Sequence, residues 1–372
     1  MSVLSGLVFP TARRAFPALI CSHIRRKHDS IPKTALRVFD SITSIRQWRR
    51  RQFFNYRSVG LVPTMGALHE GHLSLIRMAA KENAEVIVSI YVNPTQFSVN
   101  EDYDSYPKTW QRDFELLRDL DRELAEDGSS FGKIAAIFAP KTSEIYPGQS
   151  FIPKHNQIGS FVTVNPLDQL LEGTSRPLFF RGVATICTKL LNIVTPERIY
   201  FGQKDIQQTV VIKQLVKDLC IDTQVIVGET QRAPDGLALS SRNVYLGPRR
   251  RKFATALINS LRFAELQYLS GSLTRNSILD PALTYLSLAH DEQTQIGKNG
   301  VLFELDYLSL ADPETLEEIQ EIDFNKGAVL SGAIKMLPLC SSQHNEVQNL
   351  GENTTVRILD NIILKPVENV KD

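Results

Sequence analysis

The sequence predicts an α/β protein: a doubly wound parallel sheet followed by a smaller C-terminal α+β part. Two patterns lead to this prediction. Apolar runs alternate with amphipathic segments up to about residue 228, and the run at 86–92 has the continuous apolar character of a central strand buried on both faces. After about Glu229 the composition changes, and a mainly helical stretch at 248–290 precedes the last strand-like runs.

The hydrophobic period of each segment predicts the elements in order. Residues 36–56 are expected to form an amphipathic helix, and 58–66 a strand and turn that lead into a helix ending near Lys81. The parallel sheet should continue with a strand at 86–92, a helix at 108–124, a strand at 134–138, a helix at 183–194, a strand at 198–201, a helix from about Asp205 and a strand at 225–227. Strands at 302–310, 327–336 and 356–364 should form a small antiparallel sheet.

Three regions are expected along the 372 residues: an extension at 1–35, a domain at 36–231 and a smaller domain at 232–372. A hydrophobic content of 42% is ample for cores of this size. The stretches 140–170 and 341–355 are predicted to be irregular, and loops of that length are usually functional or disordered.

The N-terminal segment has its own composition. It holds five basic residues and no acidic residue before Asp29; the basic residues are Arg13, Arg14, Arg25, Arg26 and Lys27. A basic, acid-free and amphipathic segment is typical of a mitochondrial transit peptide, which predicts a mitochondrial matrix protein cleaved near residues 27–35. The alternative is a disordered extension of a cytoplasmic protein.

The charge balance and the cysteines exclude several classes of protein. A net charge of +1 gives no reason to expect nucleic acid as a partner. Cys21, Cys187, Cys220 and Cys340 are scattered, so they are expected to be reduced and mostly buried thiols and not a disulfide frame or a zinc site. No apolar run approaches the roughly 18 residues of a membrane span.

The most informative stretch lies at 62–75, where a strand, a turn and a helix are expected. Gly66 allows a tight turn, and His69 and His72 are three apart, so they share a face in the first helical turn. The unpaired amides of a helix start favour a phosphate or carboxylate. Either histidine taken alone would usually be a satisfied cap or a surface residue. A zinc helix would need a spacing of four, and a dinucleotide fingerprint would need three glycines in phase.

Polar residues follow the other predicted strands. Asn93 and Gln96 come after the strand at 86–92, and ligands of open α/β sheets lie beyond the carboxyl ends of strands. Lys204 and Asp205 open a predicted helix, and taken alone they would be a surface pair. The segment 240–242, Ser-Ser-Arg, taken alone would be a helix cap or a turn.

These strings together resemble one family. The string P-T-M-G-A-L-H-E-G-H-L-S-L at 63–75 resembles the pantothenate synthetase (pantoate–β-alanine ligase) family of the HxGH nucleotidyltransferase superfamily. Similar strings occur in that family at 201–208 and 235–243. The resemblance covers about residues 36–310, with a looser tail to about 364, and implies a Rossmann-like first domain.

The resemblance implies an ATP-dependent ligase with two steps. The pantoate carboxylate would attack the α-phosphate of ATP to give pantoyl adenylate and pyrophosphate, and the amine of β-alanine would then release pantothenate and AMP. ATP would be a substrate, Mg²⁺ would accompany its phosphates, and the protein would be a homodimer. A different nucleotidyltransferase would not need Gln96 and Gln208, and a non-catalytic nucleotide binder would be expected to lack one of His69, His72 or Lys204.

The resemblance also implies a role for each matching residue. The catalytic groups would be His69, His72, Lys204, Ser240, Ser241 and Arg242. ATP would contact these six together with Met65, Gly66, Gly71, Gly202, Gln203, Asp205, Gln231 and Leu239. Pantoate and β-alanine would contact Met65, Asn93, Gln96, Arg176 and Gln208. No metal ligand set is predicted, although Asp113 could lie near the magnesium end.

Three positions depart from the family pattern, and one loop is expected to move. Gln203 stands where Glu is usual, Leu239 replaces Met, and Phe179 stands where His is common, so no catalytic role is carried onto Phe179. The segment 240–242 resembles a loop that closes over ATP phosphates. Without ATP nothing is expected to neutralise Arg242, so the loop should be comparatively open.

Overall fold

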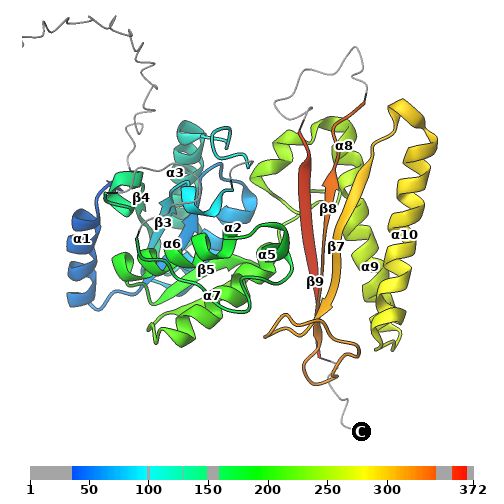
Figure 1. The fold of residues 1–372 in the computed structure, drawn as a ribbon. Helices are drawn as coiled ribbons and strands as arrows, with labels where there is room; N and C mark the ends of the chain where they lie inside the picture. Colours follow the sequence, from blue (N-terminus) through cyan, green and yellow to red (C-terminus); the bar gives the residue numbers. More distant parts are fainter. Residues whose placement is uncertain (1–35, 99–100, 129, 149–158, 341–353, 367–372) are drawn as a thin grey trace, which may run out of the picture. The chain divides into compact units, whose positions relative to one another are not determined.

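The computed structural model describes residues 36–98, 101–128, 130–148, 159–340 and 354–366 (Figure 1). The predicted extension at 1–35 lies outside the described residues. Both sheets belong to one compact unit, so the division into two domains near residue 231 stays a prediction.

A six-stranded parallel sheet has the order β1-β4-β3-β2-β5-β6. Its strands are β1 (Val38–Phe39), β2 (Val59–Thr64), β3 (Glu85–Ile90), β4 (Lys133–Phe138), β5 (Arg198–Gly202) and β6 (Gln224–Gly228). The direction of winding reverses between β2 and β5, and this switch point is where an open α/β sheet binds ligands. The predicted fold class is confirmed; the short edge strand β1 was not predicted.

Helices cover both faces of this sheet (Figure 1). On one face α2 (Glu70–Glu82) and α3 (Trp110–Asp127) pack on Val62 and Val88. On the other face α1 (Ile42–Phe54), α6 (Phe179–Val194) and α7 (Ile206–Asp218) pack on Leu61 and Ile87. All six residues of β3 are buried, which explains its continuous apolar run. The short helices of this layer are α4 (Thr142–Ile145), α5 (Glu172–Ser175), η1 (Pro94–Gln96) and η2 (Gln203–Asp205).

The C-terminal strands form a small antiparallel sheet, as predicted, and their order is β7-β8-β9. The strands are β7 (Phe303–Ala311), β8 (Ala328–Met336) and β9 (Val356–Leu364). The preceding elements are η3 (Ser241–Tyr245), α8 (Gly247–Ala254), α9 (Ala256–Leu269), α10 (Arg275–Gln295) and η4 (Gly297–Asn299). Leu257 and Leu261 of α9 join Leu330 and Ile334 of β8 in one buried cluster, which gives this sheet its own core.

The cysteines require one correction. Of those described, Cys187 is buried, but Cys220 and Cys340 are exposed, so the expectation of mostly buried thiols is wrong. The two exposed cysteines follow α7 and β8, where the chain turns at the surface. No disulfide links any of these three cysteines.

The irregular stretches are only partly described. Residues 149–158 and 341–353 lie outside the described residues, and the described remainder of 140–170 contains a single short helix, α4. Across the described ranges, every helix is too short or too polar to cross a membrane.

Candidate active site

The first turn of the site connects β2 to α2. Gly66 and Ala67 both take positive φ angles, 81° and 50°, which is easy for glycine and strained for alanine. The buried carboxylate of Asp113 in α3 holds this turn, because the amides of Ala67 and Leu68 donate to it at 3.0 and 2.8 Å. Thr109 donates a third bond at 3.0 Å. The turn is therefore built within the six-stranded layer.

This geometry corrects the prediction for Asp113. Both of its carboxylate oxygens accept bonds from the turn, its exposed fraction is 1%, and it does not line the cavity described below. Burial raises the pKa of Asp113, which opposes the charge that a metal ligand needs. Asp113 is a support of the turn and not part of a magnesium site.

The two histidines stack at the start of α2. Their ring centroids are 4.1 Å apart, and His69 is the N-cap residue. The Nδ1 atom of His69 accepts from the amide of Gly71 at 3.2 Å, and Nδ1 of His72 accepts from the amide of His69 at 3.4 Å. Since both Nδ1 atoms are acceptors, a neutral ring carries its hydrogen on Nε2. Each ring therefore has one N–H left to donate to a ligand.

Burial keeps both rings neutral. It lowers the pKa of His69 to about 4, with a further contribution from the charge of Lys204. It lowers the pKa of His72 to about 3, aided by His69 and Lys204. At neutral pH the pair is thus a set of neutral hydrogen-bond donors beside a cation.

The second turn connects β5 to α7 and carries Lys204. The Lys204 ammonium lies 3.3 Å from the carboxylate of Asp205 and lines the same cavity as the two histidines. Gln203 points elsewhere: its side-chain amide donates to Oδ1 of Asn361 in β9 at 3.1 Å. The side-chain amide of Gln203 is thus engaged by the small sheet, and the predicted contact of Gln203 with ATP stays a prediction.

An amide cluster follows β3. The side-chain amide of Asn93 donates to Oε1 of Gln96 at 2.9 Å and to the carbonyl of Gly182 at 3.2 Å. Gln96 in turn donates to the sulfur of Met65 at 3.3 Å. A Cβ on Gly182 would lie 2.4 Å from the carbonyl oxygen of Thr95, so only glycine lets α6 approach η1 this closely.

Two arginines of the site are paired with the acidic segment after η1. Arg176 forms two bonds of 2.8 Å with Glu101, and its guanidinium lies 3.6 Å from the ring centroid of Phe179. Arg242 forms bonds of 2.9 and 2.8 Å with Asp102. The expectation that nothing neutralises Arg242 without ATP is wrong, because the protein supplies its own carboxylate.

The Ser-Ser-Arg loop reaches the first turn. Ser240 caps η3 by accepting from the amide of Arg242 at 3.3 Å, and Ser241 donates to the carbonyl of Ala67 at 3.2 Å. These bonds connect the loop to the histidine turn directly.

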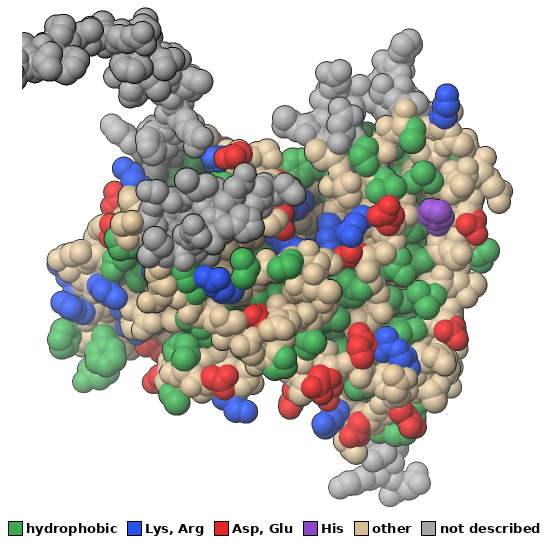
Figure 2. Space-filling view, viewed as in Figure 1, with side chains coloured by type: hydrophobic (Ala, Val, Ile, Leu, Met, Phe, Trp, Pro, Cys, Tyr) green, Lys and Arg blue, Asp and Glu red, His purple; other side chains and the backbone are tan. Residues whose placement is uncertain are grey.

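Basic side chains gather in the hollow beside the small sheet, with acidic side chains next to them (Figure 2).

One cavity collects most of the predicted residues. It is lined by Met65, His69, Gly71, His72, Asn93, Gln96, Arg176, Gly202, Lys204, Asp205, Gln208, Gln231, Leu239, Ser240, Ser241 and Arg242. Gly66 shapes the turn without lining the cavity. Glu172 and Arg357 also line it and were not predicted. Neither residue lies in a recognisable motif, and Arg357 comes from β9.

The described residues contain no group of three or more His, Cys, Asp or Glu side chains that could hold a metal ion.

A doubly wound sheet with neutral imidazole donors, a lysine and an arginine at its switch point defines an enzyme that acts on a phosphorylated, nucleotide-like substrate.

Comparison with known proteins specifies the class. The family model for pantoate–β-alanine ligase matches residues 37–363. A pantothenate synthetase from Thermotoga neapolitana is 41% identical over 288 residues, which is 77% of this chain and 92% of that protein. The chain belongs to the pantoate–β-alanine ligase family and is a ligase of pantothenate biosynthesis.

Solved structures agree. The pantothenate synthetase of Thermus thermophilus superimposes with a TM-score of 0.69 at 33% identity, and the match covers 89% of this chain and 100% of that one. The pantoate–β-alanine ligase of Francisella tularensis, determined with β,γ-ATP and β-alanine, has a TM-score of 0.56 at 32% identity, covering 88% of this chain and 98% of that one.

Proposed function

We propose that the cavity joins pantoate to β-alanine at the expense of ATP through a pantoyl adenylate, with the histidine turn and the lysine turn holding the phosphates. The observation that carries this proposal is the convergence of His69, His72 and Lys204 at the switch point between β2 and β5. The two Nε2–H groups, the ammonium and Arg242 are donors of the kind that stabilises charge developing on a phosphate.

In the first step the pantoate carboxylate attacks the α-phosphorus and pyrophosphate leaves. Negative charge then spreads over the phosphate oxygens, and fixed donors need no reorganisation at that moment. The neutral state of His72 suits this role, because burial lowers its pKa to about 3 and the ring donates without losing a proton. Ser240, Ser241 and Arg242 close the site from the other side and exclude water from the labile adenylate.

Pantoate is assigned to the amide side of the cavity. Gln96 and Gln208 line it from two different strand ends, and Asn93 fixes the orientation of Gln96. Amides match the hydroxyl groups of pantoate, and Arg176 matches an anionic oxygen. In the second step the β-alanine amine attacks the acyl carbon, and AMP leaves with the bonding electrons.

Magnesium is proposed to enter with the ATP phosphates. The carboxylate oxygens of Asp113 are occupied by the turn, so they do not fit a metal ion. No step is assigned to a metal held by the protein.

The test is AMP formation from ATP by the purified protein. AMP should appear only when both pantoate and β-alanine are present, and exchange of pyrophosphate into ATP should require pantoate alone. AMP release that ignores pantoate would instead favour another nucleotidyltransferase.

Two further assignments are proposed on other grounds. The family resemblance suggests a homodimer, which sedimentation equilibrium of the purified protein can test. The basic segment before Asp29 suggests import into the mitochondrial matrix. Sequencing the mature N-terminus from isolated mitochondria tests import, and a cytoplasmic protein that keeps its first residues would contradict it.

A further inference from the structure

Strand β9 of the small sheet contacts two segments that carry cations of the site, the lysine turn and the short helix α5 that precedes Arg176. Arg357 and Asn361 lie four residues apart on β9, so they face the same side of the strand. Arg357 reaches α5, whose C-cap is Arg176, and Asn361 reaches η2, which carries Lys204. One strand therefore contacts the supports of both cations.

Asn361 holds the lysine turn by three bonds. Its side-chain amide donates to the carbonyls of Gln203 and Lys204, each at 2.9 Å, and its Oδ1 accepts from the Gln203 amide at 3.1 Å. The exposed fraction of Asn361 is 1%, so its side chain is held at this interface, and its loss would remove both bonds to the carbonyls of the lysine turn. The direction of the Lys204 side chain depends on this backbone.

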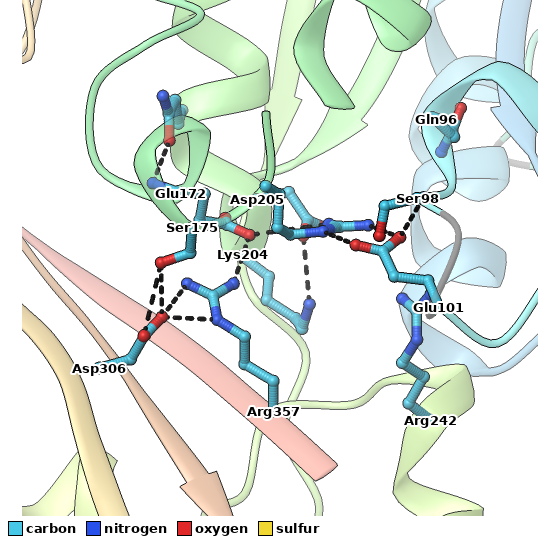
Figure 3. A network of polar contacts seen from close by, with 12 residues as sticks. Gln96, Ser98, Glu101, Glu172, Ser175, Lys204, Asp205, Arg242, Asp306 and Arg357 are labelled. Atoms are coloured by element: carbon cyan, nitrogen blue, oxygen red, sulfur yellow. Dashed lines mark hydrogen bonds and ion pairs between the residues drawn. The ribbon is translucent and has the colours of Figure 1, made fainter. Parts of the chain in front are cut away.

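Arg357 holds the helix that precedes Arg176. Its Nη1 lies 2.7 Å from Oε2 of Glu172, the first residue of α5, and its Nε donates to Asp306 of β7 at 2.8 Å (Figure 3). Asp306 also accepts from the hydroxyl of Ser175, the last residue of α5, at 3.2 Å. A four-residue helix is too short to be stable alone, so its orientation depends on these two anchors.

We propose that Asn361 and Arg357 are positioning residues with separate duties: Asn361 sets Lys204 for ATP, and Arg357 sets Arg176 for pantoate. The proposal rests on the proposed roles of Lys204 and Arg176. The competing explanation is that both residues merely dock the small sheet, in which case removing either would affect both substrates alike.

The test compares KM values for the two substrates in the full-length enzyme. Asn361→Ala should raise the KM for ATP about tenfold and change the KM for pantoate by less than about twofold, since about 1.4 kcal/mol corresponds to a factor of ten. Arg357→Lys keeps the charge but lacks the planar fork that bridges Glu172 and Asp306. It should raise the KM for pantoate about tenfold and leave the KM for ATP within about twofold.

A matched control is Gln293→Ala. Gln293 is a buried amide, 2% exposed, whose Oε1 accepts from the amide of Val301 at 3.1 Å, and it does not line the cavity. It should lower Tm without separating the two KM values. If Asn361→Ala does not fold, Asn361→Ser should show the same selectivity with a smaller rise in the KM for ATP.

The outcomes are separable. Equal changes of both KM values in both variants, or changes that follow only the loss of Tm as in the control, would overturn the positioning roles. A wild-type protein that releases no AMP would instead overturn the proposed function. Opposite selectivity in the two β9 variants is the result that a docking role alone cannot produce.

Discussion

The two turns at the switch point differ in how they are held. The histidine turn after β2 is fixed from its own layer, by the buried carboxylate of Asp113 beneath Ala67 and Leu68. The lysine turn after β5 is fixed from the other sheet, by the side chain of Asn361. The amides of the first turn are therefore held within the parallel layer, with one further bond from Ser241 to the carbonyl of Ala67, whereas the second turn is held by the C-terminal strand.

The two turns also differ in the kind of group that they present to a ligand: neutral donors on the first and a cation on the second. Neutral donors can be built with few partners, because burial is the largest cause that lowers the pKa values of His69 and His72, with a further contribution from the charge of Lys204. Cations need partners that balance their charge in a cavity: Arg242 has Asp102, Arg176 has Glu101, and Lys204 has Asp205. Substitutions on the neutral donors and on the paired cations should therefore have different effects.

The largest effect is expected for His72→Ala. Removing a donor at the reacting phosphate should lower kcat by about 10²- to 10⁴-fold. The Tm should change little, because the polar ring edge contributes little to the core. Near-normal AMP release by this variant would show that the histidine turn does not take part in the chemistry.

The next effect concerns the charged half. Arg242→Ala should slow pyrophosphate exchange into ATP by about 10²-fold, as removal of one transition-state donor does. Asp102→Asn should instead improve ATP binding and lower the KM for ATP by a few-fold. A neutral amide binds the guanidinium of Arg242 less strongly than a carboxylate does, so it competes less well with the phosphates of ATP. If both variants weaken ATP use equally, the Arg242–Asp102 pair is needed as a unit and does not compete with phosphate.

A smaller effect tests the support of the histidine turn. Asp113→Ala removes three hydrogen bonds to a buried carboxylate and should lower the free energy of unfolding by about 1–3 kcal/mol, measured by urea denaturation. Thr109→Ala is the milder companion, since it removes only one of the three donors. Unchanged stability in Asp113→Ala would mean that the turn holds without this anchor.

The smallest effect is spectroscopic. NMR titration should give midpoints near the pKa values of about 4 for His69 and about 3 for His72. Because unfolded histidine has a pKa near 6.5, the unfolded chain binds more protons as pH falls below that value, and stability falls from there to about pH 4 through His69 and to about pH 3 through His72. Above pH 6.5 they contribute no pH dependence. A midpoint above 6 for either ring would contradict the neutral-donor assignment.

The local motifs were predictable from sequence. His69 and His72 were found because strand, turn and helix follow one another within 62–75, and Lys204 because the same pattern recurs at 201–208. The three strands of the small sheet were predicted from three apolar runs. In each case the sequence pattern and the structure that it predicts lie within the same short segment of the chain.

The partners of these motifs were not predictable. Asp102 meets Arg242 from 140 residues away, and Arg357 meets Glu172 from 185 residues away. No periodicity or spacing in the sequence marks either pair, because the packing of distant elements decides which of their side chains meet. Arg242 was consequently expected to be unpaired, and Asp113 was expected only to lie near the magnesium end, since nothing in the sequence indicates that it supports a turn.

The close approach of α6 to η1 bears on how this family can change its substrate. Gly182 admits no side chain, since a Cβ there would lie 2.4 Å from the carbonyl oxygen of Thr95. Its own carbonyl accepts from Asn93, which orients Gln96. A swap of the 93–97 segment for one with another specificity would succeed only if α6 were exchanged with it, so the two segments are expected to be inherited as one module.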